Sequence, residues 1–172
     1  PDDAPQVFRY LSDKRPRVRA AAVRGLARLD LPPHAPVIVD RVLDVAPSVS
    51  RAAREVLERR PELLDFDAIE RKYGLATARH ARINLVALMT HAGRWRGLRF
   101  LLDVSRGGDE LSELAIEQLR QWAVRGVRSF VKPTPREWSA ASDALMKSSL
   151  TLGSLTAEIR GQLETWRPDG LT

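Results

Sequence analysis

Seven arginines have the type and spacing that could bind an anionic partner. Residues seven and eleven apart in a helix lie on one face, and Arg17, Arg24 and Arg28 follow that spacing. A guanidinium group binds a carboxylate or a phosphate through two parallel hydrogen bonds. The sequence therefore predicts a basic partner-binding surface made of Arg17, Arg24, Arg28, Arg51, Arg54, Arg79 and Arg82.

The basic residues are unevenly distributed in kind and in position. Residues 9–28 contain seven basic residues and one acid, Asp13, an excess that equals the net charge of +6 for all 172 residues. The chain has 24 arginines and 4 lysines, a bias that coding composition explains as readily as selection for anion contacts. A solvated, arginine-rich helix face is therefore the alternative to a binding surface.

Other residues with catalytic or metal-binding potential lack the necessary spacing. His80 and His91 are eleven residues apart, roughly 16 Å along one helix and too far to share a metal. His34 follows Pro33 in an expected turn, and Gly107-Gly108 lacks the lysine of a phosphate-binding loop. Without cysteine there is no thiolate site. We expect no enzyme activity, no cofactor and no metal.

An internal repeat of 31 residues determines where these side chains lie. Leucine recurs at this interval in Leu26, Leu57, Leu88 and Leu119. The same offset relates two further apolar sets, which are Val7, Ile38, Ile69 and Phe100, and Leu11, Val42, Tyr73 and Val104. A repeated period of this length is typical of a stacked helical array.

Each copy has the pattern of two helices joined by a turn. In the second helix of the first copy, one apolar face with a 3.6-residue period comprises Val18, Ala21, Ala22, Gly25, Leu26 and Leu29. Positions 17, 20, 24, 27 and 28 are expected to face away from the core. Turns are expected within copies at Lys14-Arg15-Pro16, Ala46-Pro47 and Gly107-Gly108-Asp109, and between copies at Leu31-Pro32-Pro33 and Arg60-Pro61-Glu62.

The segments 13–29 and 47–57 resemble the turn and second helix of the HEAT-repeat family. The resemblance covers residues 3–126 and implies four helix pairs at 3–31, 32–62, 63–93 and 94–126. It implies an all-α fold, an α-solenoid whose second helices line a concave groove, and a non-catalytic binding scaffold. His80 and Asn84 depart from the small and aliphatic residues that the family places at these positions.

The period fails after Trp122. Residues 127–134 are expected to be a linker, and 135–172 a C-terminal helical cap that begins with the capping box Thr134-Pro135-Arg136-Glu137. Its helices are expected to run to about Lys147 and over about 155–166. Trp95, Trp122 and Phe130 are interpreted as packing residues for this cap rather than as base-stacking groups. No such cap precedes the first copy, so we expect this chain to be a fragment of a longer repeat protein.

The leading functional hypothesis is a scaffold that binds a protein or an acidic peptide in the basic groove. In the fourth copy the groove positions become acidic, at Glu110, Glu113 and Glu117, which would orient the partner. The alternative is DNA or RNA backbone binding through the same arginines. A HEAT-like DNA glycosylase is a third possibility that rests on fold resemblance alone. No apolar run approaches the length of a membrane span, so we expect a soluble, cytoplasmic protein without a membrane partner.

Overall fold

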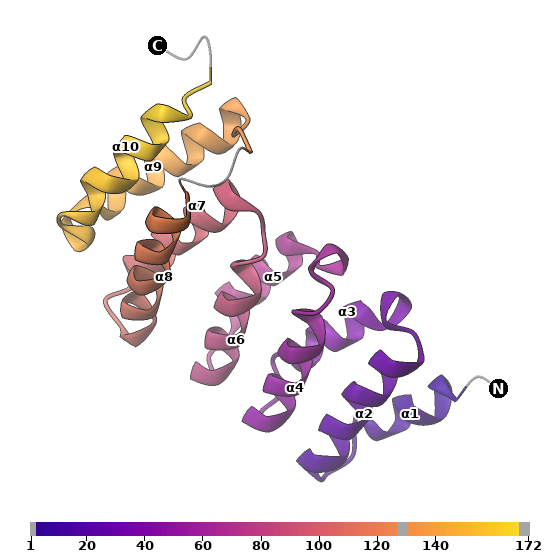
Figure 1. Cartoon of the computed structure of the whole chain (residues 1–172). Coiled ribbons are helices and arrows are strands. Elements are labelled where there is room, and N and C mark those ends of the chain that lie inside the picture. The colour runs from indigo at the N-terminus through magenta and orange to yellow at the C-terminus, as the bar shows by residue number, and fades with distance from the viewer. Residues whose placement is uncertain (1–2, 127–130, 169–172) are drawn as a thin grey trace. The chain divides into compact units, whose positions relative to one another are not determined.

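The computed structural model describes residues 3–126 and 131–168, which form ten α-helices, one short 3-10 helix and no strand (Figure 1). The expected all-α class is confirmed. The chain divides into two compact units, Pro1–His91 and Ala92–Thr172. Phe130, the first part of the expected linker and the last four residues of the expected cap lie outside the described residues.

The N-terminal unit consists of three helix pairs in two layers. Its helices are α1 (Ala4–Tyr10), α2 (Pro16–Leu29), α3 (Leu31–Arg41), α4 (Pro47–Leu57), α5 (Phe66–Leu75) and α6 (Arg79–Met89). The first helices α1, α3 and α5 lie on one side, and the second helices α2, α4 and α6 lie on the other (Figure 1). In the second layer, α4 packs against both α2 and α6.

Proline occupies the first or second position of four of these helices, α1 to α4. Pro16 and Pro47 occupy the first positions of α2 and α4, where the missing N–H costs no intrahelical hydrogen bond. The expected turn at Leu31-Pro32-Pro33 is wrong for the same reason, because these residues form the first turn of α3 and only Asp30 separates α2 from α3. His34 is therefore helical.

The repeat positions are buried as expected. Leu26, Leu57, Leu88 and Leu119 are all 0% exposed, which confirms the prediction for this register. The expected apolar face of α2 is wrong at its edges, because Ala21 and Leu29 are exposed and Ala20 is buried. The reason is that α4 lies between the second helices α2 and α6, whereas α4 is the only second helix that packs against α2 in the described part of this unit.

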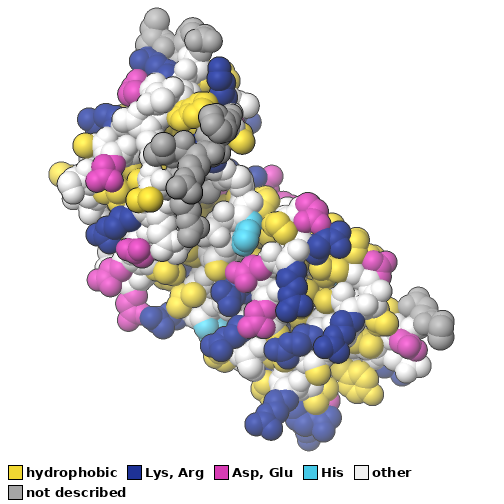
Figure 2. Space-filling view, viewed as in Figure 1, with side chains coloured by type: hydrophobic (Ala, Val, Ile, Leu, Met, Phe, Trp, Pro, Cys, Tyr) yellow, Lys and Arg dark blue, Asp and Glu magenta, His cyan; other side chains and the backbone are white. Residues whose placement is uncertain are grey.

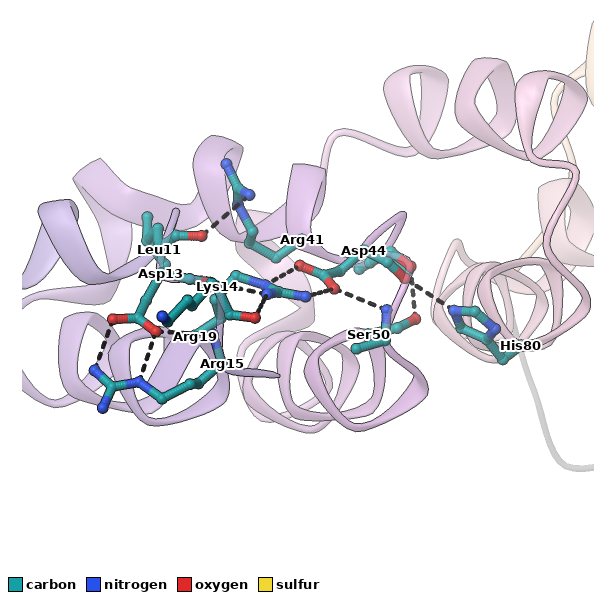
Figure 3. Close-up of polar contacts among 11 residues, drawn as sticks. Leu11, Asp13, Lys14, Arg15, Arg19, Arg41, Asp44, Ser50 and His80 are labelled. Atoms are coloured by element: carbon teal, nitrogen blue, oxygen red, sulfur yellow. Dashed lines mark hydrogen bonds and ion pairs between the residues drawn. The ribbon is translucent and has the colours of Figure 1, made fainter. Parts of the chain in front are cut away.

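A buried ion pair joins α2 to the turn before α4 (Figure 3). Arg19 donates Nε and Nη2 to the Asp44 carboxylate at 2.8 and 2.7 Å, and it donates Nη1 to the Asp13 carbonyl oxygen at 2.9 Å. Asp44 also accepts the Ala46 N–H at 2.9 Å. The pair therefore fixes α2 relative to the start of α4.

The same contacts determine the acidity of Asp44. Burial raises the pKa of its carboxyl group, but the hydrogen bonds from Arg19 and Ala46 and the charges of Arg19 and Arg41 outweigh burial. The pKa of Asp44 therefore lies below its ordinary value.

The polar residues of the third copy have partners in the second. His80 Nε2 donates to the Asp44 carbonyl oxygen at 2.9 Å (Figure 3). Asn84 donates to Ser50 Oγ at 2.7 Å, and Ser50 donates to the Val42 carbonyl oxygen at 2.6 Å. These hydrogen bonds compensate for polar groups at core positions. His80 and Asn84 thus join neighbouring helix pairs through hydrogen bonds.

The C-terminal unit contains α7 (Arg94–Ser105), α8 (Glu110–Gly126), α9 (Pro135–Leu152) and α10 (Leu155–Thr165). Helix α9 packs on α7, and α10 packs on α8. The expected capping box is present, since Thr134 Oγ1 accepts the Glu137 N–H at 3.2 Å and Glu137 accepts the Thr134 N–H at 2.9 Å.

Helix α9 is longer than expected. It continues past Lys147 to Leu152 and ends at Gly153, which has a φ of +55°. Ser148 is compatible with the helix because its hydroxyl lies 2.8 Å from the carbonyl oxygens of Ala144 and Leu102.

Tryptophans surround Arg94 in this unit. The Arg94 guanidinium lies 4.8, 5.0 and 5.7 Å from the ring centroids of Trp95, Trp122 and Trp166, and it donates to Gln162 at 2.8 Å. Burial lowers the pKa of Arg94. The interpretation of Trp95 and Trp122 as packing residues is confirmed, because these contacts join α7 and α8 to α10 and to the segment that follows it.

Truncation of a repeat leucine tests the packing. Leu57→Ala should lower the free energy of unfolding by roughly 2–5 kcal/mol, because it leaves a cavity at a fully buried site. The control Leu150→Ala, at a side chain that is 98% exposed, should stay within about 0.5 kcal/mol. Urea denaturation measures both, and equal midpoints for the two variants would contradict the packing.

The pH dependence of stability tests the Arg19–Asp44 pair. At pH 7, Asp44→Asn should be less stable than the wild type by about 2 kcal/mol, because it loses charge-assisted hydrogen bonds. Since the pKa of Asp44 is lowered on folding, this stabilisation exists above the unfolded-state pKa of about 3.9 and is lost as pH falls through the folded pKa. Urea denaturation from pH 7 to pH 2 should show the difference narrowing below about pH 4. A difference independent of pH would show that the charge of Asp44 does not stabilise the fold.

Candidate basic surface

All seven predicted arginines lie on second helices of the N-terminal unit. Helix α2 carries Arg17, Arg24 and Arg28, α4 carries Arg51 and Arg54, and α6 carries Arg79 and Arg82. Lys and Arg side chains gather over α2 and α4 in the space-filling view (Figure 2). We call the exposed surface of α2, α4 and the residues that follow α4 the basic surface.

Three of the seven arginines are available to a partner. Arg17, Arg28 and Arg51 are exposed, and none of them forms an ion pair with a residue in the described part of the chain. A guanidinium in this state can bind an incoming carboxylate or phosphate without breaking an internal contact.

Two others are weakly engaged. Arg24 lies 3.9 Å from Glu55 across the α2–α4 junction, and both side chains are about half exposed. Arg54 lies 3.5 Å from Glu58 on its own helix. Solvent-exposed pairs such as Arg24–Glu55 contribute little to stability, so Arg24 can exchange its internal partner for an external one. The Arg54 and Glu58 side chains are only 28% and 29% exposed, so Arg54 is less accessible.

The arginines of α6 are arranged differently. Arg82 donates to the Tyr73 hydroxyl at 2.8 Å, and its guanidinium lies 4.9 Å from the centroid of that ring. It therefore contributes to the packing of α5 against α6. Arg79 is exposed at the first position of α6.

A cleft of about 480 Å³ opens at the C-terminal ends of α2 and α4. Four arginines and two carboxylates line it, which are Arg24, Arg28, Arg59, Arg60, Asp30 and Glu55. The apolar lining is Ala27, Leu29, Leu31, Pro32 and Val56. Cations near the C-terminal ends of helices are stabilised by the helix dipole. The cleft thus combines positive charge with an apolar wall.

Arg59 and Arg60 were not among the seven predicted residues. Arg59 is exposed and follows Arg28 by one period of 31 residues, so the repeat itself contained the signal. Arg60 forms an ion pair with Glu62.

The positions expected to face away from the core, and their equivalents one or two periods later, are not all exposed. Ala20 and Val86 occupy positions expected to face solvent and are both buried, so the basic residues form a patch rather than a regular groove. The acidic Glu110, Glu113 and Glu117 are exposed, but they belong to the C-terminal unit. The expected orientation of a partner by these acids stays a prediction.

Family models, curated proteins and solved structures were compared with the chain, and none of them matches it. Within residues 3–126 and 131–168, no group of three His, Cys, Asp or Glu side chains is placed to hold a metal ion. Over the same residues, no helix has the length and hydropathy of a membrane span. Function must therefore be inferred from the chemistry of the basic surface.

Alanine substitution separates surface arginines from structural ones. Arg28→Ala and Arg51→Ala should change the free energy of unfolding by less than about 0.5 kcal/mol, because neither side chain has an internal ion pair among the described residues. Arg19→Ala should cost about 3 kcal/mol, because it leaves the Asp44 carboxylate buried without its partner. Chemical denaturation of the three variants measures the difference. A cost for Arg28→Ala similar to that of Arg19→Ala would remove Arg28 from the binding surface.

Proposed function

We propose that this chain is a non-catalytic scaffold, a HEAT-like α-solenoid whose basic surface binds an acidic segment of another protein. The observation that carries the proposal is the cleft at the ends of α2 and α4, where four arginines meet an apolar wall. Arginine contacts to carboxylates anchor the segment, and its apolar side chains cover Leu29, which is 46% exposed.

Recurring contacts support the HEAT-like arrangement. Ser50 donates to the Val42 carbonyl oxygen, and Ser112 Oγ lies 3.3 Å from the carbonyl oxygen of Val104. These two pairs are separated by 62 residues, which is two periods. An identical hydrogen bond at a whole number of periods, together with the four buried leucines, favours one repeated packing unit.

The lining of the cleft favours a peptide over a nucleic acid. Asp30 and Glu55 lie among the arginines, and a continuous phosphate backbone is repelled by carboxylates. A phosphodiester chain has no apolar side chains to pack against the exposed Leu29 and the neighbouring Val56 and Leu31. An acidic peptide with interspersed apolar residues matches both features of the cleft.

Charge reversal in the cleft tests this proposal. The probe is a fluorescein-labelled peptide of Glu-Leu-Pro repeats, which is extended and acidic, and fluorescence anisotropy measures its affinity. Arg28→Glu with Arg59→Glu should weaken binding by at least about tenfold. The control Arg160→Glu, at an exposed position of α10, should bind as the wild type does.

A short DNA duplex distinguishes the alternative function. If the duplex binds more tightly than the peptide, without sequence preference and with affinity that falls steeply as salt rises, the basic surface binds nucleic-acid backbone. If neither probe binds, or if the Arg160 control loses as much affinity as the cleft variant, the scaffold proposal is wrong.

A further inference from the structure

A second hollow lies where the turns of the first two helix pairs meet. Its volume is about 510 Å³, which is within the range of small-ligand sites. Residues 11–14, between α1 and α2, line it together with Arg19 and residues 40, 41 and 43–45 at the end of α3 and in the turn after it. We call this space the turn pocket. It shares no lining residue with the cleft of the basic surface.

The three carboxylates of the turn pocket already have cationic partners. The shortest N–O distances are 2.7 Å for Arg19–Asp44, 2.9 Å for Arg15–Asp13 and 2.6 Å for Lys72–Asp40. The hydrogen bonds from Arg15 lower the pKa of Asp13 to about 2, so this carboxylate is ionised at neutral pH and remains attracted to Arg15.

Two basic side chains of the pocket have no acidic partner. Lys14 is exposed and Arg41 is half-buried, and neither forms an ion pair with a residue in the described part of the chain. Among the side chains of the pocket and their ion-pair partners, five basic groups meet three carboxylates. The excess of two positive charges corresponds to Lys14 and Arg41.

The hydrogen bonding of Arg41 is incomplete. Its Nε is buried and has no hydrogen-bond partner among the described residues. Its Nη1 donates to the Leu11 carbonyl oxygen at 3.4 Å (Figure 3), which is longer than an ordinary N–H···O bond. A cation that has lost water without gaining a counter-ion is unfavourable. An anion at the terminal nitrogens of Arg41 therefore compensates a charge that the fold leaves uncompensated.

Val45 gives the turn pocket an apolar rim. Its side chain is 85% exposed in the turn between α3 and α4, and Leu43 beside it is half-buried. Covering such a side chain removes apolar surface from water. The pocket thus suits a ligand that joins an anionic group to an apolar or aliphatic one.

We propose that the turn pocket binds a phosphate monoester. At neutral pH this group carries a charge close to −2, which matches the two unpaired cations, whereas a carboxylate would leave one of them unpaired. Arg41 and Lys14 donate hydrogen bonds to the phosphate oxygens, and the group that carries the phosphate lies against Val45. The site is separate from the basic surface, so it does not depend on the proposed scaffold function.

Phenyl phosphate is the probe, and benzoate is its matched control because it keeps the ring but has a single negative charge. Amide chemical shifts of the nitrogen-15-labelled full chain, at constant ionic strength and about pH 7.5, report both affinity and position. Phenyl phosphate should bind at least about tenfold more tightly than benzoate, with the largest shifts in residues 11–14 and 40–45. Shifts centred on Arg28 and Arg59 would place the anion in the cleft and overturn the inference.

Three variants test the two cations. Lys14→Gln and Arg41→Gln should each weaken binding of phenyl phosphate by at least about fivefold. The control Arg9→Gln removes one positive charge at an exposed position of α1 outside the pocket, and it should bind as the wild type does. If thermal unfolding shows that Arg41→Gln is not folded, Lys14→Gln decides, because Lys14 is exposed. Equal losses in Lys14→Gln and Arg9→Gln would show a general attraction of charge and overturn the inference.

A peptide distinguishes the two sources of a phosphate monoester. The probe is the blocked pentapeptide Ala-Val-phosphoserine-Val-Ala, with the unphosphorylated peptide as its control. Tighter binding of this phosphopeptide than of phenyl phosphate assigns the pocket to a phosphorylated partner protein, and the reverse order assigns it to a small phosphate ester; both results support a phosphate site.

The remaining outcomes overturn the inference without affecting the scaffold proposal. Benzoate that binds as tightly as phenyl phosphate would show that the pocket does not select a dianion. An absence of binding by both phosphate probes up to about 10 mM would show that it is not a phosphate site. The scaffold proposal depends instead on Arg28→Glu with Arg59→Glu in the cleft, so the two tests fail independently.

Discussion

A short helix pair has more apolar surface than it can bury by itself, and the structure of the N-terminal unit depends on this constraint. Helix α4 contains only eleven residues, Pro47–Leu57, and six of them are buried. That burial requires helices on several sides, which α2, α3 and α6 provide. Packing of second helix on second helix, and of second helix on first helix, therefore stabilises this unit. It also places side chains one period apart on neighbouring helices.

This packing divides the arginines into two kinds. Arg19 lies at the junction between two pairs, where it is almost completely covered and holds Asp44. Arg17, Arg24 and Arg28 lie on the opposite side of the same helix and reach solvent. A guanidinium that has to compensate a buried carboxylate is structural, whereas one that faces water can exchange its solvent contacts for a partner. Charge count alone would assign the same role to both.

The two units use different chemistry to join their helices. In the N-terminal unit, the junctions contain an ion pair and a chain of hydrogen bonds from Asn84 through Ser50 to Val42. In the C-terminal unit, the guanidinium of Arg94 lies among three tryptophan rings. The first arrangement satisfies its polar groups through a carboxylate and backbone carbonyls, and the second places the guanidinium charge against aromatic faces. The basic surface is confined to the unit that has no such tryptophan cluster among its described residues.

The sequence by itself determined the helical class and the burial of the four leucines that recur every 31 residues, and the capping box at Thr134 determined the start of α9, because these follow from local spacing and capping chemistry. It did not determine that Leu31-Pro32-Pro33 is helical, since proline is equally compatible with a turn and with the first turn of a helix. The contrast between exposed Ala21 and buried Ala52 was also beyond the sequence, because identical residues differ only in whether another helix lies beside them. Tertiary structure alone decided that Arg59 and Arg60 join Arg24 and Arg28 in one cleft while Arg82 holds Tyr73. A period places a residue on a helix face, but the neighbouring helix decides whether that face meets protein or solvent.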